Sequence, residues 1–204
     1  WAPKSVLMAS YSYYMQDYYS LAIENIKRYL ETYPNDKNQA YAHYLLAICY
    51  FELIEGEKKD TAALYLAKKE FELVISRYPD TDYAYDSKFK VDLLKDLLAA
   101  KEIYLGRYYM KKEKWIPALN RFKFVMEKYE TTEYVEEAIH RMVEINYKLG
   151  LIDESKKYAA LLGYNYQSSE WYKETYKIFN KDYKLPKVNK KKNKTVQKIK
   201  NFFN

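Results

Sequence analysis

The sequence predicts an all-α fold, a solenoid of stacked antiparallel helix pairs. One frame occurs four times, in which a small residue precedes a tyrosine by eleven positions: Ala22 and Tyr33, Ala67 and Tyr78, Ala118 and Tyr129, Ser155 and Tyr166. The residues four and eight positions after the small one are Ile26, Phe71, Phe122 and Ala159, then Leu30, Ile75, Met126 and Gly163. Small and apolar residues at this spacing form one stripe of a helix. A stripe that recurs in the same register indicates a repeat protein.

Each tyrosine of the frame is expected to end the second helix of a pair. Proline cannot continue a helix, so Tyr33-Pro34 and Tyr78-Pro79 indicate helix ends. A second small-residue frame opens nine residues after each of the first three tyrosines, at Ala42, Ser87 and Ala138. Side chains able to cap the following helix also stand behind the tyrosines: Asp80, Thr81, Thr131, Thr132, Ser168 and Ser169. The pattern is that of tetratricopeptide repeats, with about four helix pairs and a C-terminal helix.

The first helix is expected to carry Ser5 at its small position. Residues 1–5 parallel residues 83–87, which directly follow a Tyr-Pro stop. By that register an earlier stop lies before residue 1. We therefore expect at least one further repeat and a targeting signal to precede this sequence in the intact protein.

Later units are longer than the usual repeat of about 34 residues. Successive tyrosines of the frame are 45, 51 and 37 residues apart. The polar stretch at residues 55–60 is expected to form a long turn. Residues 83–111 are expected to form a single helix of about eight turns.

The basic character of the chain is concentrated at its C-terminal end. The whole chain has a net charge of +7, whereas residues 181–204 hold nine lysines and one aspartate, a net +8 that leaves −1 for the rest. We expect residues 1–183 to form the solenoid and residues 184–204 a basic tail that is disordered or lies on a membrane surface. The repeats lack the basic face of a nucleic-acid binder, so no nucleic-acid partner is expected.

No residue pattern predicts an enzyme, a metal site or a cofactor. His43 and His140 lie outside any metal-binding spacing, and both are expected to have surface or packing roles. Cys49 lies in an apolar run and is expected to be a small core residue. With only four glycines, the chain also has no glycine-rich phosphate loop or dinucleotide fingerprint.

A combination of motifs resembles the BamD family, the tetratricopeptide lipoproteins of the bacterial β-barrel assembly (BAM) machinery. The motifs are Asn120-Arg121-Phe122, Tyr108-Tyr109 with Trp115 and Ala118, the stop at residues 78–84, and the late segment at residues 165–172. The ending Ser169-Glu170-Trp171-Tyr172 is most similar to the alphaproteobacterial branch, and the resemblance covers about residues 1–183. The chain departs from the family at Tyr129-Glu130 and Tyr166-Gln167, which replace Tyr-Pro, and in lacking the lipobox cysteine.

The resemblance implies a scaffold at the periplasmic face of the outer membrane, lipid-anchored at the N-terminus of the full-length protein. Its implied partners are the POTRA domains of BamA, other BAM lipoproteins and unfolded outer-membrane protein clients. A generic tetratricopeptide adaptor in the periplasm or cytosol is the alternative. A nucleic-acid protein acting through its lysine tail is a third, remote class.

Three groups of residues are candidates for these contacts. The client groove is expected on the inner helices of the first two pairs, at Tyr11, Tyr14, Tyr18, Tyr41 and Tyr44, unless these rings only pack between helices. The BamA interface is expected at Tyr108, Tyr109, Asn120 and Arg121, where a guanidinium can clamp a carboxylate. The alternative for Arg121 is an intramolecular bridge to Glu102 or Glu144.

The third group lies in the tail, where Val196, Ile199 and Phe203 share one helical face. With Lys198, Ile199, Phe202 and Phe203, this basic amphipathic segment suits an anionic membrane surface. The alternatives to membrane binding are that this end of the chain is solvated and disordered, or that it packs on another subunit of the machinery.

Overall fold

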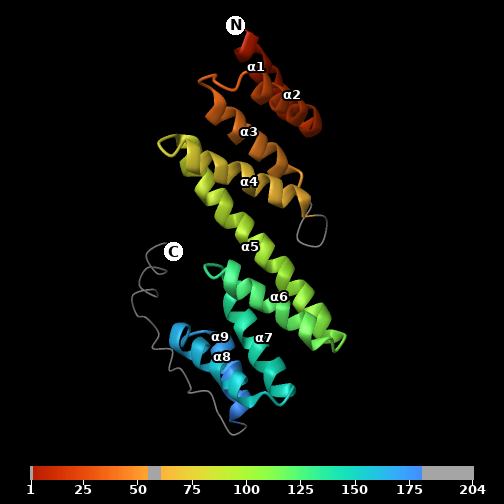
Figure 1. The fold of residues 1–204 in the computed structure, drawn as a ribbon, viewed down its shortest axis with the longest axis vertical. Coiled ribbons are helices and arrows are strands. Elements are labelled where there is room, and N and C mark those ends of the chain that lie inside the picture. The colour runs from red at the N-terminus through yellow and green to blue at the C-terminus, as the bar shows by residue number, and fades with distance from the viewer. Residues whose placement is uncertain (1, 55–60, 181–204) are drawn as a thin grey trace, which may run out of the picture.

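The computed structural model describes residues 2–54 and 61–180, and all regular structure in these ranges is α-helical. Figure 1 shows the helices stacked along the long axis of the molecule, with the N-terminus at one end. The nine helices of these ranges are α1 (Ala2–Tyr14), α2 (Tyr19–Thr32), α3 (Gln39–Glu52), α4 (Ala62–Arg77), α5 (Asp82–Lys111), α6 (Trp115–Lys128), α7 (Tyr134–Lys148), α8 (Ile152–Asn165) and α9 (Glu170–Phe179).

The helices pack as four consecutive pairs and one final helix. α1 packs on α2, α3 on α4, α5 on α6 and α7 on α8, while α9 packs on α7 and α8. Contacts of α3 with α5 and of α5 with α7 place the first helices of successive pairs along one side. The prediction of an all-α tetratricopeptide solenoid with four pairs and a C-terminal helix is confirmed.

The repeated frame forms the core of every pair, with one correction to its spacing. The small residues Ala22, Ala67, Ala118 and Ser155 are all fully buried. The residue four positions on is also fully buried in α2, α4 and α6, and half-buried at Ala159 in α8. A further fully buried position follows seven residues after the small one in every helix, at Tyr29, Val74, Val125 and Leu162. The predicted eighth position is only half-buried. Seven residues bring a helix to within about 20° of the starting position, whereas eight residues end about 80° away from it.

All four tyrosines of the frame end their helices as predicted. Tyr33, Tyr78, Tyr129 and Tyr166 are the C-cap residues of α2, α4, α6 and α8, and each donates its backbone N–H to the carbonyl four residues before. Two of these ends form without a following proline. The tyrosine frame therefore predicts the helix ends better than Tyr-Pro alone.

Two of the predicted caps form and one does not. The hydroxyl oxygens of Thr81 and Ser169 accept hydrogen bonds from the backbone N–H of the third residue beyond them, which caps α5 and α9. The Thr132 hydroxyl instead donates to the Tyr129 carbonyl at 2.7 Å, and α7 has no side-chain cap. The predicted small position at Ser5 is also wrong, because Ser5 is exposed and the buried small residue of α1 is Ser10.

The long helix α5 confirms the expectation for residues 83–111 and joins the two halves of the solenoid (Figure 1). Gly106 allows α5 and α6 to approach closely, because a Cβ atom there would lie 2.5 Å from the ring of the buried Phe122. The predicted turn at residues 55–60 and the boundary at residue 183 lie outside the described residues.

The histidines and the cysteine have the structural roles that were expected. His43 Nδ1 lies 2.8 Å from Glu70, and the buried His140 lies 2.7 Å from the Thr175 hydroxyl. Cys49 is fully buried in the core. Over the described part of the chain, no helix is both long and apolar enough to cross a bilayer.

Candidate interaction surfaces

Tyrosines from three successive inner helices form one continuous surface in the N-terminal half. Tyr11 and Tyr14 of α1 have ring centroids 6.1 Å apart. Tyr41 and Tyr44 of α3 both contact Tyr83 of α5, with centroid distances of 5.6 Å and 5.2 Å. We call these five residues the tyrosine surface. Sequence reasoning missed Tyr83, because it lies at the start of α5, outside the first two helix pairs in which the groove was expected.

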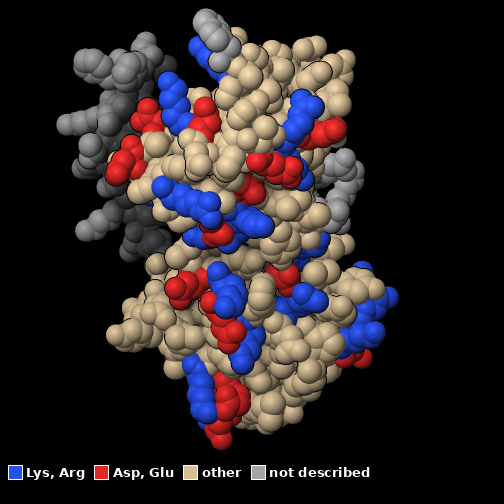
Figure 2. Space-filling view, turned by 45° about the horizontal axis from the view of Figure 1, so that its top comes forward, with Lys and Arg blue, Asp and Glu red and all other residues tan. Residues whose placement is uncertain are grey.

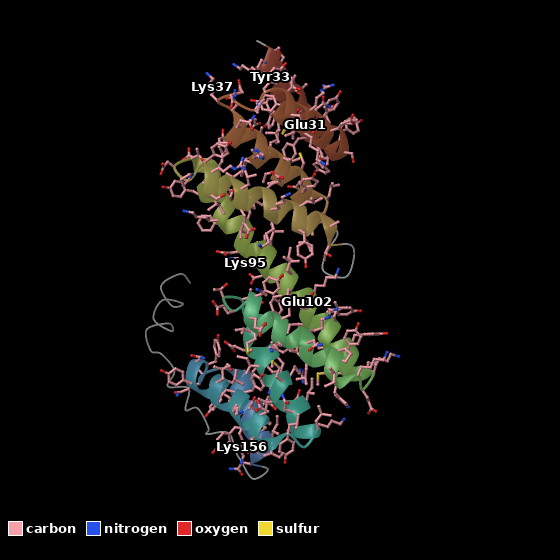
Figure 3. All side chains as sticks on the ribbon, viewed as in Figure 1. Glu31, Tyr33, Lys37, Lys95, Glu102 and Lys156 are labelled. Carbon is pink, nitrogen blue, oxygen red and sulfur yellow. The ribbon has the colours of Figure 1, made fainter. Side chains whose placement is uncertain are left out.

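A groove of about 690 Å³ opens between α1 and the start of α3. The buried Leu7 lies at its base, while Met8 and Tyr11 are 60% and 45% exposed and form one side. Tyr41 lines it from α3, and Lys4 and Lys37 bring two cations to it. Figure 3 labels Lys37 in this end of the molecule. The size is within the range of about 300–1,000 Å³ of ligand-binding clefts.

The other three predicted groove residues do not line this cavity. Tyr44 donates its hydroxyl to Asp86 at 2.8 Å and packs edge-on against Phe71, so it joins α3 to α4 and α5. Burial, followed by that hydrogen bond, raises the pKa of Tyr44. Tyr14 packs beside Tyr11, and Tyr18 is 56% exposed in the turn before α2. Of the five residues predicted for the client groove, only Tyr11 and Tyr41 therefore line it.

A smaller depression lies in the C-terminal half where α5 ends and α6 begins. It has a volume of about 270 Å³ and is lined by Tyr109, Pro117, Asn120, Arg121 and Phe124. Three of the four residues predicted for the BamA interface therefore lie together. We call this set the arginine surface. The helix α6 begins at Trp115, so Asn120 and Arg121 lie in its second turn.

The fourth predicted residue, Tyr108, adjoins this depression. Its ring packs edge-on against Tyr109 with centroids 5.8 Å apart, and it is 50% exposed. Tyrosine and arginine are both enriched among the residues that contribute most to binding at protein interfaces.

Arg121 forms one of the two intramolecular bridges that the sequence left open. Its Nη1 donates to Glu102 Oε2 at 3.0 Å, and Figure 3 labels Glu102 on α5. The Glu102 side chain is 11% exposed, whereas that of Arg121 is 42% exposed. The hydrogen bond with Glu102 raises the pKa of Arg121. The other candidate, Glu144, accepts a hydrogen bond from Arg141 at 2.6 Å. The bridge to Glu102 leaves the guanidinium partly accessible to a partner.

Further ion pairs fix the angle between the third and fourth helix pairs. Arg107 of α5 donates from two nitrogens to the buried Glu137 of α7, and Arg141 Nε lies 3.3 Å from the same carboxylate. Sequence reasoning missed this pair, because Arg107 and Glu137 are 30 positions apart and no local spacing joins them.

Charges over the described surface are mixed in sign. Figure 2 shows Lys and Arg side chains interspersed with Asp and Glu on the face drawn, without a broad basic area. The predicted membrane contacts Lys198, Ile199, Phe202 and Phe203 lie outside the described residues.

Comparison with known proteins gives one consistent result. A family model, YfiO, described as an outer membrane lipoprotein, matches residues 1–162. A Caulobacter vibrioides protein named outer membrane protein assembly factor BamD is 40% identical over 188 residues, 92% of this chain and 62% of that protein. The protein of that name from Rickettsia prowazekii is 42% identical over 176 residues, 86% of this chain and 70% of that protein. The chain thus spans just under two thirds of the Caulobacter relative, and the resemblance drawn from the motifs is confirmed.

Proposed function

The chain belongs to the YfiO family of outer membrane lipoproteins, and from this premise we propose that it is a non-catalytic scaffold of the outer-membrane β-barrel assembly machinery. Its C-terminal half docks the POTRA domains of BamA, and its N-terminal half helps to receive unfolded outer-membrane proteins. It works at the periplasmic face of the outer membrane, held by an N-terminal lipid anchor. The observation that carries the proposal is the presence of two separate depressions, each on a different half of one solenoid.

The groove between α1 and α3 suits an extended peptide that ends in an aromatic residue. Met8, Tyr11 and Tyr41 offer apolar and aromatic contact, which selects an aromatic side chain without reading a sequence. Lys4 and Lys37 outnumber the one carboxylate of the lining, Asp36, and supply positive charge for the terminal carboxylate of such a peptide. Because an extended peptide loses freedom on binding, the dissociation constant is expected to be micromolar.

Substitution of one exposed tyrosine inside the groove and one outside it tests this assignment. Tyr11→Ser removes a groove wall, whereas Tyr18→Ser removes a similarly exposed tyrosine that does not line the groove. Fluorescence anisotropy of a labelled peptide ending in phenylalanine should show binding weakened about tenfold by the first change and unaltered by the second. Equal effects of the two changes, with circular dichroism preserved, would show that the groove is not the binding site.

The arginine surface suits a carboxylate of a POTRA domain. Arg121 is held by Glu102 at the margin of the depression and is 42% exposed, so its guanidinium is positioned before the partner arrives. Charge-assisted hydrogen bonds contribute about 1.5–3 kcal/mol. Loss of one such bond to a partner lowers affinity by about 10- to 100-fold.

Two neutralising changes separate an interface role from an internal one. Arg121→Ala removes both the bridge and the contact with the partner, whereas Glu102→Gln disrupts the bridge and keeps the guanidinium. We expect POTRA binding, measured by calorimetry, to be lost only in Arg121→Ala. If Glu102→Gln lowers the affinity for POTRA domains as much as Arg121→Ala does, the bridge acts only by fixing the helices, and Arg121 is not part of the interface. If the unmodified chain does not bind POTRA domains, the generic adaptor is the better description.

A further inference from the structure

The long helix α5 exposes an apolar stripe that no other described helix covers. Tyr85, Phe89 and Leu93 follow one another at four-residue spacing and are 57%, 76% and 46% exposed. They lie opposite the buried face of α5, which includes Val91 and Leu98. Phe89 is too exposed to contribute to the core, so its side chain is available to a ligand.

Acidic residues flank this stripe. Asp82, Asp86, Asp92 and Asp96 all project within about 60° of Phe89 on a helix of 3.6 residues per turn. Burial and the charges of Glu133 and Asp92 raise the pKa of Asp96, so Glu133, just before α7, belongs to the same acidic region. We call Tyr85, Phe89 and Leu93 with these four aspartates the α5 stripe.

Three lysines lie along the edges of the α5 stripe and are already engaged. Lys95, labelled on α5 in Figure 3, lies 3.0 Å from Asp92. Lys88 lies over the Tyr85 ring at 5.1 Å, and Lys90 over the Phe51 ring at 4.7 Å. The centre of the face therefore combines apolar side chains with negative charge, and its ligand should be apolar and basic.

We propose that the α5 stripe binds the C-terminal segment of this same chain, residues 195–203. In that segment Val196, Ile199 and Phe203 are apolar at helical spacing, and Lys198 and Lys200 lie between them. Both its apolar pattern and its charge complement the α5 stripe. The interaction is intramolecular, so a weak contact is sufficient at the high effective concentration that a short linker provides.

The connecting chain is long enough for this contact. Phe179 packs on Tyr147 at the end of α7 with ring centroids 5.5 Å apart, and the other end of α7 lies beside Asp96. The 15 residues of α7 span about 22 Å, and Phe89 lies about 10 Å further along α5. The residues from 181 to 194 reach up to about 46 Å when extended. The segment can therefore arrive on α5 without unfolding any described helix.

The bound segment also adjoins the tyrosine surface. Asp86 of the α5 stripe also accepts the hydrogen bond from Tyr44 of the tyrosine surface. The segment therefore lies beside the tyrosine surface and faces the same side of the solenoid.

Disulfide trapping in the full-length chain tests the contact. The test variant combines Asn204→Cys, at the last residue, with Lys88→Cys at the edge of the α5 stripe. The control variant combines Asn204→Cys with Lys157→Cys on α8, where the native lysine side chain is 70% exposed. Helix α8 packs on α9, so a freely moving tail reaches Lys157→Cys at least as often. Buried Cys49 does not compete. We expect the intramolecular disulfide with Lys88→Cys to form about tenfold faster than the control.

Additional substitutions show whether the side chains of the α5 stripe cause the faster disulfide formation. Phe89→Ser with Asp92→Asn should abolish that advantage, with circular dichroism unchanged because both side chains are exposed. Equal rates for Lys88→Cys and Lys157→Cys would overturn the proposal, and disulfides formed mainly between two chains would assign the contact to a second copy instead. The proposal would also be overturned if anionic vesicles alone protect Asn204→Cys from a thiol reagent and the disulfide with Lys88→Cys forms no faster than the control. That result would assign the segment to the membrane.

Discussion

Replacing Gly106 by alanine places a methyl group where the Phe122 ring now lies. The new Cβ would be 2.5 Å from ring atoms Cε1 and Cζ, and the ring is fully buried between helices, so it cannot move aside freely. Overpacking of this kind costs about 1–3 kcal/mol, whereas alanine in a helix gains about 1 kcal/mol over glycine. We expect the free energy of unfolding to fall by up to about 2 kcal/mol, the balance of the two effects.

The sign of the Gly106 effect should reverse when the ring is removed. Phe122→Ala alone should cost about 3–5 kcal/mol, because it leaves a cavity. In that background Gly106→Ala meets no ring, so the helix propensity alone should stabilise by about 1 kcal/mol. Urea unfolding followed by circular dichroism measures all four proteins of the cycle. The packing argument is wrong if Gly106→Ala stabilises the protein equally with and without the ring.

Three further predictions concern single side chains. Tyr44→Phe should lower the free energy of unfolding by about 0.5–1.5 kcal/mol through loss of the hydrogen bond to Asp86, yet leave peptide binding unchanged, which a binding titration checks. Burial opposes ionisation of Glu144, but hydrogen bonds from a histidine and an arginine of the same helix lower its pKa below 4.5. The ionised side chain therefore stabilises the fold above pH 4.5 and loses this effect as the pH falls, so Glu144→Gln should reduce the loss of stability at acid pH in urea titrations. Burial raises the pKa of Cys49 to about 12, so a thiol reagent at neutral pH should modify it only after unfolding, and rapid labelling of the native protein would contradict its core position.

The sequence was sufficient for features that depend on local spacing. Small residues, the tyrosines that end helices and the length of α5 follow from patterns within one or two helices. The error of one residue in the apolar stripe arose because position eight lies only about 40° from position four, so an apolar residue there also matches the stripe. Only the packing partner selects Val74 rather than Ile75 as the more buried.

Features that depend on distant partners could not be read from the sequence. Tyr41 and Tyr44 lie on the same helix, but Tyr44 packs between helices because Phe71 and Asp86, from other helices, meet it. The choice of Glu102 rather than Glu144 as the partner of Arg121 likewise depends on how α5 and α6 cross.

A crossed binding measurement tests the central claim that the two halves of the solenoid bind different partners. POTRA domains and a peptide ending in phenylalanine are each titrated into Arg121→Ala and Tyr11→Ser. We predict that Arg121→Ala loses only POTRA binding and that Tyr11→Ser loses only peptide binding, because each residue lines a different depression. Loss of both ligands in either folded variant, or retention of both in each, would contradict the account.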